Sequence, residues 1–402
     1  MKKKRINYQL ILSPFISQLG SAIFLLGLNW LLVKATGDTK LVGLVTGIGG
    51  IMYIVGDVVG ASLVDHHDRK LVLIACDALA AAACLLGAWL ITPANPQTWL
   101  LIFVTAVLDL MTAINYPAAK ALTPDVIAPS ALQSFNAIAN TAFSMASVVA
   151  PMVGGLLLAS KMLGFQGFML VNAGSYFVAA LLNASIKAPR FKPVQAKSHL
   201  IGDTISGLSF VFKSRQLTEL MLALGAYNFC ASGFLLTAPF IADQRFAGQP
   251  TAYSNFLLLS AVGGILGGIL IATQKRAVST LQLYLEQIVL ALLLIYLGFH
   301  LTHPLWLAIA FISGFFDSQL FSSLSTLMQA VTPRPMLGRV IGLIFLVFDG
   351  VAPLSNMFFG QFIHAWNAHT YTVLGVLLIV VFSWLAWQAV RNKRQQPPVT
   401  DD

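Results

Sequence analysis

Long apolar runs, each separated from the next by a few polar residues, extend along this chain from one end to the other. A transmembrane helix needs about 20 mainly apolar residues, and twelve segments meet that requirement. Pro, Gly, Asn and charged residues fill most of the short connections, which is typical of turns between helices. The pattern predicts membrane-spanning helices at approximately 8–33, 41–64, 71–92, 98–121, 131–159, 166–186, 217–242, 251–273, 278–299, 304–330, 338–363 and 370–390.

One connection, which follows the sixth apolar segment, is much longer than the others and includes a stretch at 201–212 with the character of a short surface helix. It divides the chain into an N-terminal six-helix bundle (1–186), a cytoplasmic linker (187–216), a C-terminal six-helix bundle (217–390) and a cytoplasmic tail (391–402). We therefore expect an all-α membrane protein in which twelve helices form two pseudo-repeats.

The two halves repeat short motifs in the same order. Residues 121–124 (Ala-Leu-Thr-Pro) close the fourth segment, and residues 330–333 (Ala-Val-Thr-Pro) close the tenth. An Ala-Pro pair lies in the fifth segment at 150–151 and in the eleventh at 352–353. Such internal repetition is the arrangement of many secondary transporters.

Composition agrees with this class, because 57% of the residues are hydrophobic and only 10% are charged, against about 25% charged in soluble domains. The net charge of +9 follows from the placement of the basic residues. All Lys and Arg residues except Lys34, Lys40, Lys161 and Arg245 fall on the side that holds the N-terminus. The positive-inside rule then predicts a multi-pass cell (plasma) membrane protein with both termini cytoplasmic. No nucleic-acid partner is needed to explain the basic charge.

Motifs for cofactors are absent from the sequence. Cys76, Cys84 and Cys230 lie inside apolar runs without metal-ligand spacing, and no Gly-rich phosphate loop ending in Gly-Lys-Ser/Thr occurs. We therefore expect no metal, no cofactor and no ATP. The pair His66 and His67 lies at a turn and is expected to be solvated.

Charge is concentrated in the turn between the second and third segments, Asp65-His66-His67-Asp68-Arg69-Lys70. This turn resembles the signature loop of the major facilitator superfamily, whose pattern is Gly-x-Leu-Ala-Asp-Arg-x-Gly-Arg-Arg/Lys. Asp68 in place of the second Gly, together with Asp77 in the following run, is similar to the macrolide-efflux and enterobactin-exporter branch. Further similarities to that branch occur along the whole chain, at 116–118, 123–125, 203–211 and 338–340.

The resemblance implies a transporter with alternating access, in which helices 1, 2, 4, 5, 7, 8, 10 and 11 line a central cavity. It also implies a cytoplasmic gate, formed by Asp65 and Arg69 as the latch together with Lys70, Asp125 and Arg339. Pro151, Gly154 and Gly155 resemble the fifth-helix motif of exporters. The chain departs from the superfamily pattern at Ala61 and His66, and Asp109 lies in the fourth helix, which lacks the Arg common in proton-coupled drug exporters.

Acids within the apolar segments point to function, because a charged side chain at mid-bilayer costs about 2.5–3.5 kcal/mol. The segments contain six acids and no Lys or Arg near their centres, and a carboxyl group removed from water is easier to protonate. We therefore expect Asp109 and Asp317, then Asp349 and Asp57, to act in proton or substrate coupling. The alternative is a hydrogen-bonded structural acid, which we favour for Asp77 and Glu286.

Amide and aromatic side chains within the helices are further candidates to line the cavity, although ordinary helix packing also accounts for any one of them. They are Asn29, Trp30, Asn115, Tyr116, Asn136, Asn140, Tyr227, Asn228 and Asn356. A large aromatic cavity that contains acids suits lipophilic cations.

Together these features predict a secondary active exporter, not an enzyme, that expels a lipophilic compound such as a drug or antibiotic, cationic ones included, in exchange for protons. Export of a siderophore or other metabolite, or lipid flipping, is the alternative within the same fold. A transport-inactive membrane sensor or scaffold is the alternative of another class. The expected partners are a small-molecule substrate, protons and the lipid bilayer, with a monomer as the default state.

Overall fold

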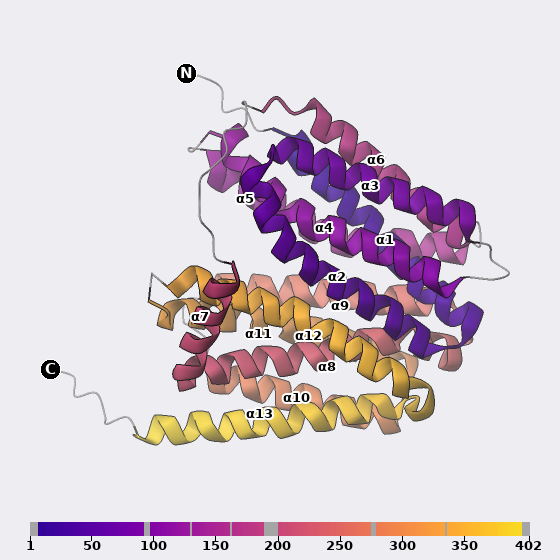
Figure 1. The fold of residues 1–402 in the computed structure, drawn as a ribbon. Helices are drawn as coiled ribbons and strands as arrows, with labels where there is room; N and C mark the ends of the chain where they lie inside the picture. The colour runs from indigo at the N-terminus through magenta and orange to yellow at the C-terminus, as the bar shows by residue number, and fades with distance from the viewer. Residues whose placement is uncertain are drawn as a thin grey trace.

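The computed structural model describes residues 7–91, 97–128, 131–160, 163–188, 200–274, 279–333 and 336–395. These residues form helices throughout (Figure 1). The helices are α1 (Gln9–Thr36), α2 (Thr39–His66), α3 (Arg69–Leu90), α4 (Thr98–Val126), α5 (Leu132–Ala159), α6 (Phe165–Ser185), α7 (Leu200–Lys213), α8 (Arg215–Arg245), α9 (Pro250–Thr273), α10 (Thr280–Phe299), α11 (His303–Val331), α12 (Leu337–Trp366) and α13 (His369–Gln395).

The twelve long helices and the short α7 match the predicted segments to within a few residues. Eleven of the helices are long and apolar enough, over the described residues, to cross a membrane. In α5 the apolar portion that the structure describes is Val148–Ala159. The predicted all-α membrane fold is therefore confirmed, and α7 takes the place of the predicted surface helix.

Polar residues define where several helices begin. Asp38 precedes α2 and accepts a hydrogen bond from the backbone N–H of Lys40. Asp68 precedes α3, and its carboxylate accepts from the N–H groups of Lys70 and Leu71. Capping satisfies donors that lack partners in the first helical turn. Asp68, which replaces the second Gly of the superfamily pattern, therefore caps the start of α3.

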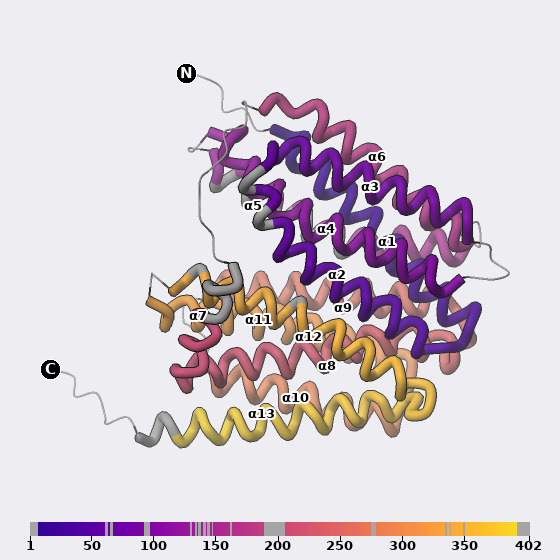
Figure 2. Tube along the Cα trace, viewed as in Figure 1, coloured from indigo at the N-terminus to yellow at the C-terminus, as the bar shows by residue number. Residues whose placement is uncertain are grey.

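The packing of the first six helices is repeated in the last six. In the N-terminal half, α2 packs on α4, α3 on α6 and α1 on α5; in the C-terminal half, α9 packs on α11, α10 on α13 and α8 on α12. The two halves meet where α2 packs on α12 and α5 on α9. Figure 2 shows the two sets of helices as separate bundles that lie against each other along these contacts. The order of the pairs supports the proposed division into 1–186 and 217–390.

Each half begins and ends at the same end of the bundle, so the bundle has two distinct ends. We call the end where α1 begins and α13 ends the terminal end, and the opposite end, which carries the α1–α2 connection, the distal end. At the distal end the halves touch closely: the hydroxyl of Thr39 donates to the backbone oxygen of Gly360 at 3.0 Å. A methyl group at Gly43 would lie 2.3 Å from the backbone oxygen of Asn356, so a side chain there would separate α2 from α12.

Candidate functional site

A large cavity lies between the two halves and has a volume of about 1420 Å³. Its described lining comes from α1, α2, α4, α5 and α6 on one side and from α11 and α12 on the other. It exceeds the 300–1,000 Å³ typical of ligand pockets. A cavity of this size is able to hold a bulky organic molecule.

The cavity extends from the middle of the helices to the terminal end. Leu10 lies near the start of α1, Thr123 near the end of α4 and Arg339 near the start of α12, and all three line it. At the distal end the contacts of Thr39 and Gly43 with α12 close the space between the halves. The structure therefore has the halves together at one end and a cavity reaching the other.

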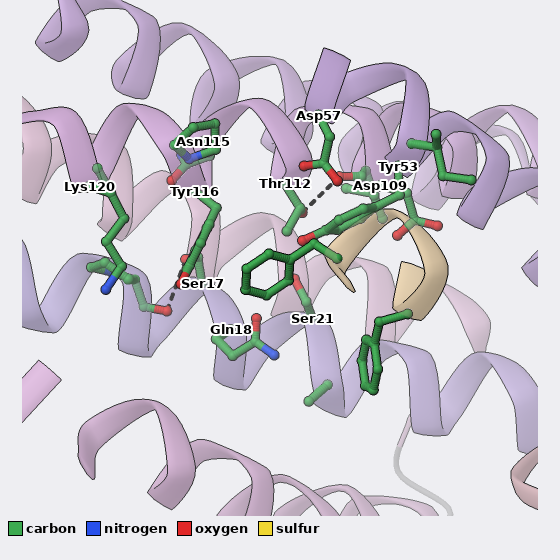
Figure 3. Close-up of a pocket in the computed structure, with 18 of the residues that line it drawn as sticks. Ser17, Gln18, Ser21, Tyr53, Asp57, Asp109, Thr112, Asn115, Tyr116 and Lys120 are labelled. Carbon is green, nitrogen blue, oxygen red and sulfur yellow. Dashed lines mark hydrogen bonds between the residues drawn. The ribbon is translucent and has the colours of Figure 1, made fainter. Parts of the chain in front are cut away.

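The two walls of the cavity differ in chemistry. Among the described lining residues, the wall from α11 and α12 is apolar except for Arg339; it consists of Phe321, Arg339, Gly342, Leu343, Phe345, Leu346 and Phe348. The opposite wall carries the polar groups, and Figure 3 shows those it labels in a row from Lys120 at one end to Tyr53 and Asp109 at the other. These polar residues are Ser17, Gln18, Ser21, Tyr53, Asp57, Thr105, Asp109, Thr112, Asn115, Tyr116, Lys120, Thr123 and Tyr176.

Asp109 and Asp57 place two carboxyl groups in the polar wall. The Asp109 carboxyl lies against α2 at Gly49, where a methyl group would be 2.2 Å from its Oδ2. It accepts no hydrogen bond from any side chain that the structure describes. Asp109 therefore has room only because residue 49 lacks a side chain, and its carboxyl is available to a proton or a ligand.

Two cations lie where the cavity reaches the terminal end. Lys120 Nζ lies 5.5 Å from the ring centroid of Tyr116, whose side chain is exposed to the cavity. Arg339 lies on the opposite wall, and its guanidinium contacts the sulfur of Met336 at 3.5 Å. The cavity is thus acidic toward the middle of the bundle and basic at its mouth.

Three hydroxyl groups form a cluster next to Asp109. The hydroxyl of Tyr176 on α6 is 2.9 Å from Ser21 Oγ and 3.1 Å from Thr112 Oγ1. The Thr112 hydroxyl also approaches the backbone oxygen of Leu108 at 2.8 Å. The cluster joins α1, α4 and α6 at the level where Asp109 enters the cavity.

Asp317 does not line this cavity, although it lies at a comparable depth in its half: it follows Trp306 by eleven residues, as Asp109 follows Trp99 by ten. Its carboxyl is in hydrogen-bond contact with the Tyr227 hydroxyl, which is also 3.4 Å from the backbone oxygen of Ser313. Tyr227 is buried and is likewise outside the lining. The side chain of Asp349 lies outside the described residues. In this conformation the N-terminal half therefore exposes Asp57 and Asp109 to the cavity, whereas Asp317 of the C-terminal half is not exposed to it.

Asp77, which we expected to be structural, is 1% exposed. Its Oδ1 accepts from Asn115 Nδ2 at 2.9 Å and its Oδ2 from Asn183 Nδ2 at 2.7 Å. Glu286 accepts a hydrogen bond from Gln282, one helical turn earlier on α10, at 3.0 Å. Neither acid lines the cavity, although Asn115 does.

Most of the other amide and aromatic candidates serve packing. Trp30 stacks on Tyr253 with ring centroids 6.2 Å apart, and Asn228 donates to the backbone oxygen of Phe348. Asn29 and Asn356 are outside the lining. The side chains of Asn136 and Asn140 lie outside the described residues. Of the candidates with described side chains, Asn115 and Tyr116 face the cavity.

The charged turn forms an ion pair within the N-terminal half. Arg69 Nη1 lies 2.6 Å from Asp125 Oδ2 and also donates to the backbone oxygen of Ala121 at 3.3 Å. The pair joins the start of α3 to the end of α4. The Asp65 side chain lies outside the described residues. Lys70 contributes its backbone N–H to the α3 cap, and Arg339 lies across the cavity mouth.

The fifth-helix residues make room for neighbouring helices. A methyl group at Gly155 would lie 2.2 Å from Ser254 Oγ on α9, and one at Gly154 would lie 3.3 Å from the side chain of Leu26 on α1. Pro151 is buried within α5. These residues allow α5 to approach α9 across the boundary between the halves.

A sequence profile described as "Major Facilitator Superfamily" matches residues 10–356. The chain belongs to the Major Facilitator Superfamily. It is therefore a multi-pass membrane transporter of small molecules and not an enzyme, as the sequence predicted.

Curated relatives of this superfamily member include the enterobactin exporter EntS of Escherichia coli (strain K12) and that of Shigella boydii serotype 4 (strain Sb227). Each is 28% identical over 384 residues, which cover 90% of this chain and 87% of the relative. The resemblance to the enterobactin-exporter branch is thereby confirmed.

Solved structures of the same fold include a bacterial homologue of the human lysosomal transporter Spinster in an inward-facing and occupied conformation (TM-score 0.75, 15% identity, 99% and 100% of the two chains). A bacterial homologue of the iron transporter ferroportin in an inward-facing state is also similar (TM-score 0.72, 16% identity, 96% and 100%). At this identity the likeness shows the fold alone.

Sequence reasoning missed part of the polar wall of this superfamily member. Tyr176 lies on α6, a helix that the resemblance places outside the cavity, and no pattern marks it. Ser17 and Ser21 are one helical turn apart on α1, and Thr112 follows Asp109 by three residues on α4. These helical spacings were the available signal for a shared polar face.

Proposed function

We propose that this protein is a proton-coupled exporter that carries a bulky, largely lipophilic organic molecule across the cell membrane by alternating access. The observation that carries the proposal is the cavity of about 1420 Å³ between the halves, apolar on one wall and polar on the other. The terminal end is cytoplasmic in this proposal, because most Lys and Arg residues fall on that side. The cavity then faces the compartment from which an exporter loads.

Asp109 is the first candidate for coupling, with Asp57 beside it in the same wall. A carboxyl group in a mainly apolar cavity exchanges protons with whichever side of the membrane the cavity faces, and a substrate that enters competes with the proton. Asp317, held by Tyr227, and Asp349 are candidates for the conformation in which the C-terminal half is exposed. This assignment makes the exporter an antiporter.

Two substrate classes have specific support. The relatives named enterobactin exporters favour a siderophore or another large metabolite. The two cavity acids, together with the aromatic rings of Tyr53, Tyr116 and Phe345, favour a lipophilic cation, the chemistry of multidrug resistance. Lipid flipping would use the same cavity. A sensor or scaffold without transport would have no use for acids in such a cavity.

The ion pair of Arg69 and Asp125 belongs to the cytoplasmic gate in this proposal, together with Asp65, Lys70 and Arg339. A partly exposed pair contributes about 0–1 kcal/mol, a scale that suits a contact made and broken in each cycle. Pro151, Gly154 and Gly155 let α5 and α9 slide as the halves move. The protein acts as a monomer.

Reconstitution into liposomes tests the proposal. With an inwardly acidic pH gradient, protein oriented to load from the outside should concentrate ethidium or enterobactin within the vesicles and alkalinise the lumen as it does so. Asp109→Asn should abolish this concentration against a gradient. Transport of neither compound class in either direction would contradict the proposed function.

A further inference from the structure

The buried carboxyl of Asp77 holds two asparagines from different helices. Asn115 on α4 donates to its Oδ1 at 2.9 Å, and Asn183 on α6 donates to its Oδ2 at 2.7 Å. Asp77 is 1% exposed and Asn183 is 2% exposed. The carboxyl therefore joins α3 to α4 and α6 inside the N-terminal half, away from the cavity.

This arrangement fixes the direction of each amide group. An ionised carboxylate only accepts hydrogen bonds, whereas an Asn amide donates from nitrogen and accepts at oxygen. In the structure both amide nitrogens point at the Asp77 oxygens. The Asn115 carbonyl oxygen is then turned away from Asp77, while Asn115 itself lines the cavity next to Tyr116 and Thr112 (Figure 3).

We propose that Asp77 is a positioning residue and that Asn115, oriented by it, is a specificity-determining acceptor for substrates that carry a hydroxyl or N–H donor. The inference rests on the proposed transport function and adds the substrate class. A donor-bearing substrate would place its hydroxyl or amine against Asn115 and its apolar face against Leu346 and Phe345 on the opposite wall.

The two asparagines differ in a way that a purely structural cluster does not explain. Asn183 is buried and does not line the cavity, so we assign it only the hydrogen bond to Asp77. Asn115 is half-buried and presents its remaining surface to the cavity. A buried acid that served packing alone would not need a partner at the substrate surface.

Matched probe pairs test the proposal in proteoliposomes. Ethidium carries two aromatic amines, and tetraphenylphosphonium is a lipophilic cation without a donor; enterobactin and its O-methylated form make a second pair. Asn115→Leu should lower the kcat/KM of the donor-bearing member about 3- to 10-fold, the effect of one lost hydrogen bond. The member without the donor should change less than twofold.

Exchanging the side chains of Asp77 and Asn115 distinguishes the orientation of residue 115 from its packing as the cause of the donor preference. Asp77→Asn alone supplies an amide that cannot accept from both neighbours, so the donor preference should fall. The double variant Asp77→Asn with Asn115→Asp restores a donor at 77 toward an acceptor at 115 and leaves an oxygen on the cavity side, so the preference should return. Asn183→Leu is the control: it removes the other hydrogen bond to Asp77 and should leave the preference unchanged.

The outcomes are distinguishable. Equal losses for both members of each pair in Asn115→Leu, or a double variant that fails to regain the preference while it folds, would overturn the inference and leave the transport function standing. Transport of none of the four probes by the unmodified protein would overturn both.

Discussion

Lys34 Nζ lies 2.9 Å from Asp243 Oδ1, so an ion pair joins the last turn of α1 to the last turn of α8 at the distal end. The two residues belong to different halves of the chain. The Lys34 side chain is 54% exposed and that of Asp243 is 13% exposed. Together with the Thr39–Gly360 hydrogen bond, the pair holds the halves together at the end opposite the cavity mouth.

Lys34→Ala should shift the protein toward conformations open at the distal end. A partly exposed pair contributes about 0–1 kcal/mol, so the ratio of closed to open protein should fall by up to about 5-fold. Spin labels at Gln97 and Gln249, both exposed at the distal end, would report this as longer distances in pulsed electron paramagnetic resonance. Reversing both charges should restore the distribution. Lys40→Ala, which removes a nearby exposed charge without a described ion pair, is the control, and an equal shift in it would contradict the assignment.

Gly49→Ala should disable Asp109 without touching its side chain. The added methyl group would lie 2.2 Å from Asp109 Oδ2, so the carboxyl must move out of its place beside α2. Proton-driven accumulation in proteoliposomes should fall at least about 10-fold, a loss that corresponds to about 1.4 kcal/mol.

The control for Gly49→Ala is Gly174→Ala on α6, because a methyl group there meets no heavy atom within 4 Å. Ala also favours a helix over Gly by about 1 kcal/mol, so Gly174→Ala should retain full transport and stability. Normal accumulation by Gly49→Ala would show that the position of the Asp109 carboxyl does not matter for coupling.

The positions of the helices were predictable because each is an apolar run long enough to span a bilayer, bounded by residues such as Asp38 and Asp68 that cap helix starts. Asp109 was found for the same reason: an acid within such a run is costly unless it faces protein or water. Its counterpart Asp317 shows the limit of that argument. Position along a helix follows from sequence, whereas the direction in which a side chain points depends on how the helices pack.

Packing decides that direction through contacts between residues far apart in the chain. Gly263 on α9 lies so close to α11 that a methyl group would be 2.1 Å from the backbone oxygen of Phe311. This crossing fixes the rotation of α11 and with it the side of the helix that carries Asp317. Tyr176 faces the cavity for a similar reason, because α6 packs on α1.

Asp109→Asn should uncouple transport from protons, and Asp317→Asn should weaken the coupling less, because Asp317 does not line the cavity. Asn keeps the size of the side chain and removes its ability to exchange a proton. In Asp109→Asn, downhill counterflow of ethidium or enterobactin should persist, and substrate-dependent proton movement, followed with a luminal pH dye, should disappear. Tyr227→Phe removes the hydroxyl that contacts Asp317. It should change neither measurement by more than about threefold, which corresponds to less than about 1 kcal/mol. Proton movement undiminished in Asp109→Asn would exclude this residue as the coupling site.

Arg69→Ala and Asp125→Asn should each slow turnover without altering substrate affinity. The pair joins α3 to α4 at 2.6 Å, next to the cavity mouth but outside the lining, so it affects the movement of the halves rather than binding. Because a pair of this exposure contributes about 0–1 kcal/mol, we expect kcat to fall about 2- to 5-fold with KM unchanged. The double variant should be no slower than either single one, since both remove the same contact. Lys187→Ala is the control, because it removes an exposed cation that follows α6 in the same half and forms no ion pair with a described residue. It should transport normally, and an equal loss in it would assign the effect to positive charge in general instead of to the Arg69–Asp125 pair.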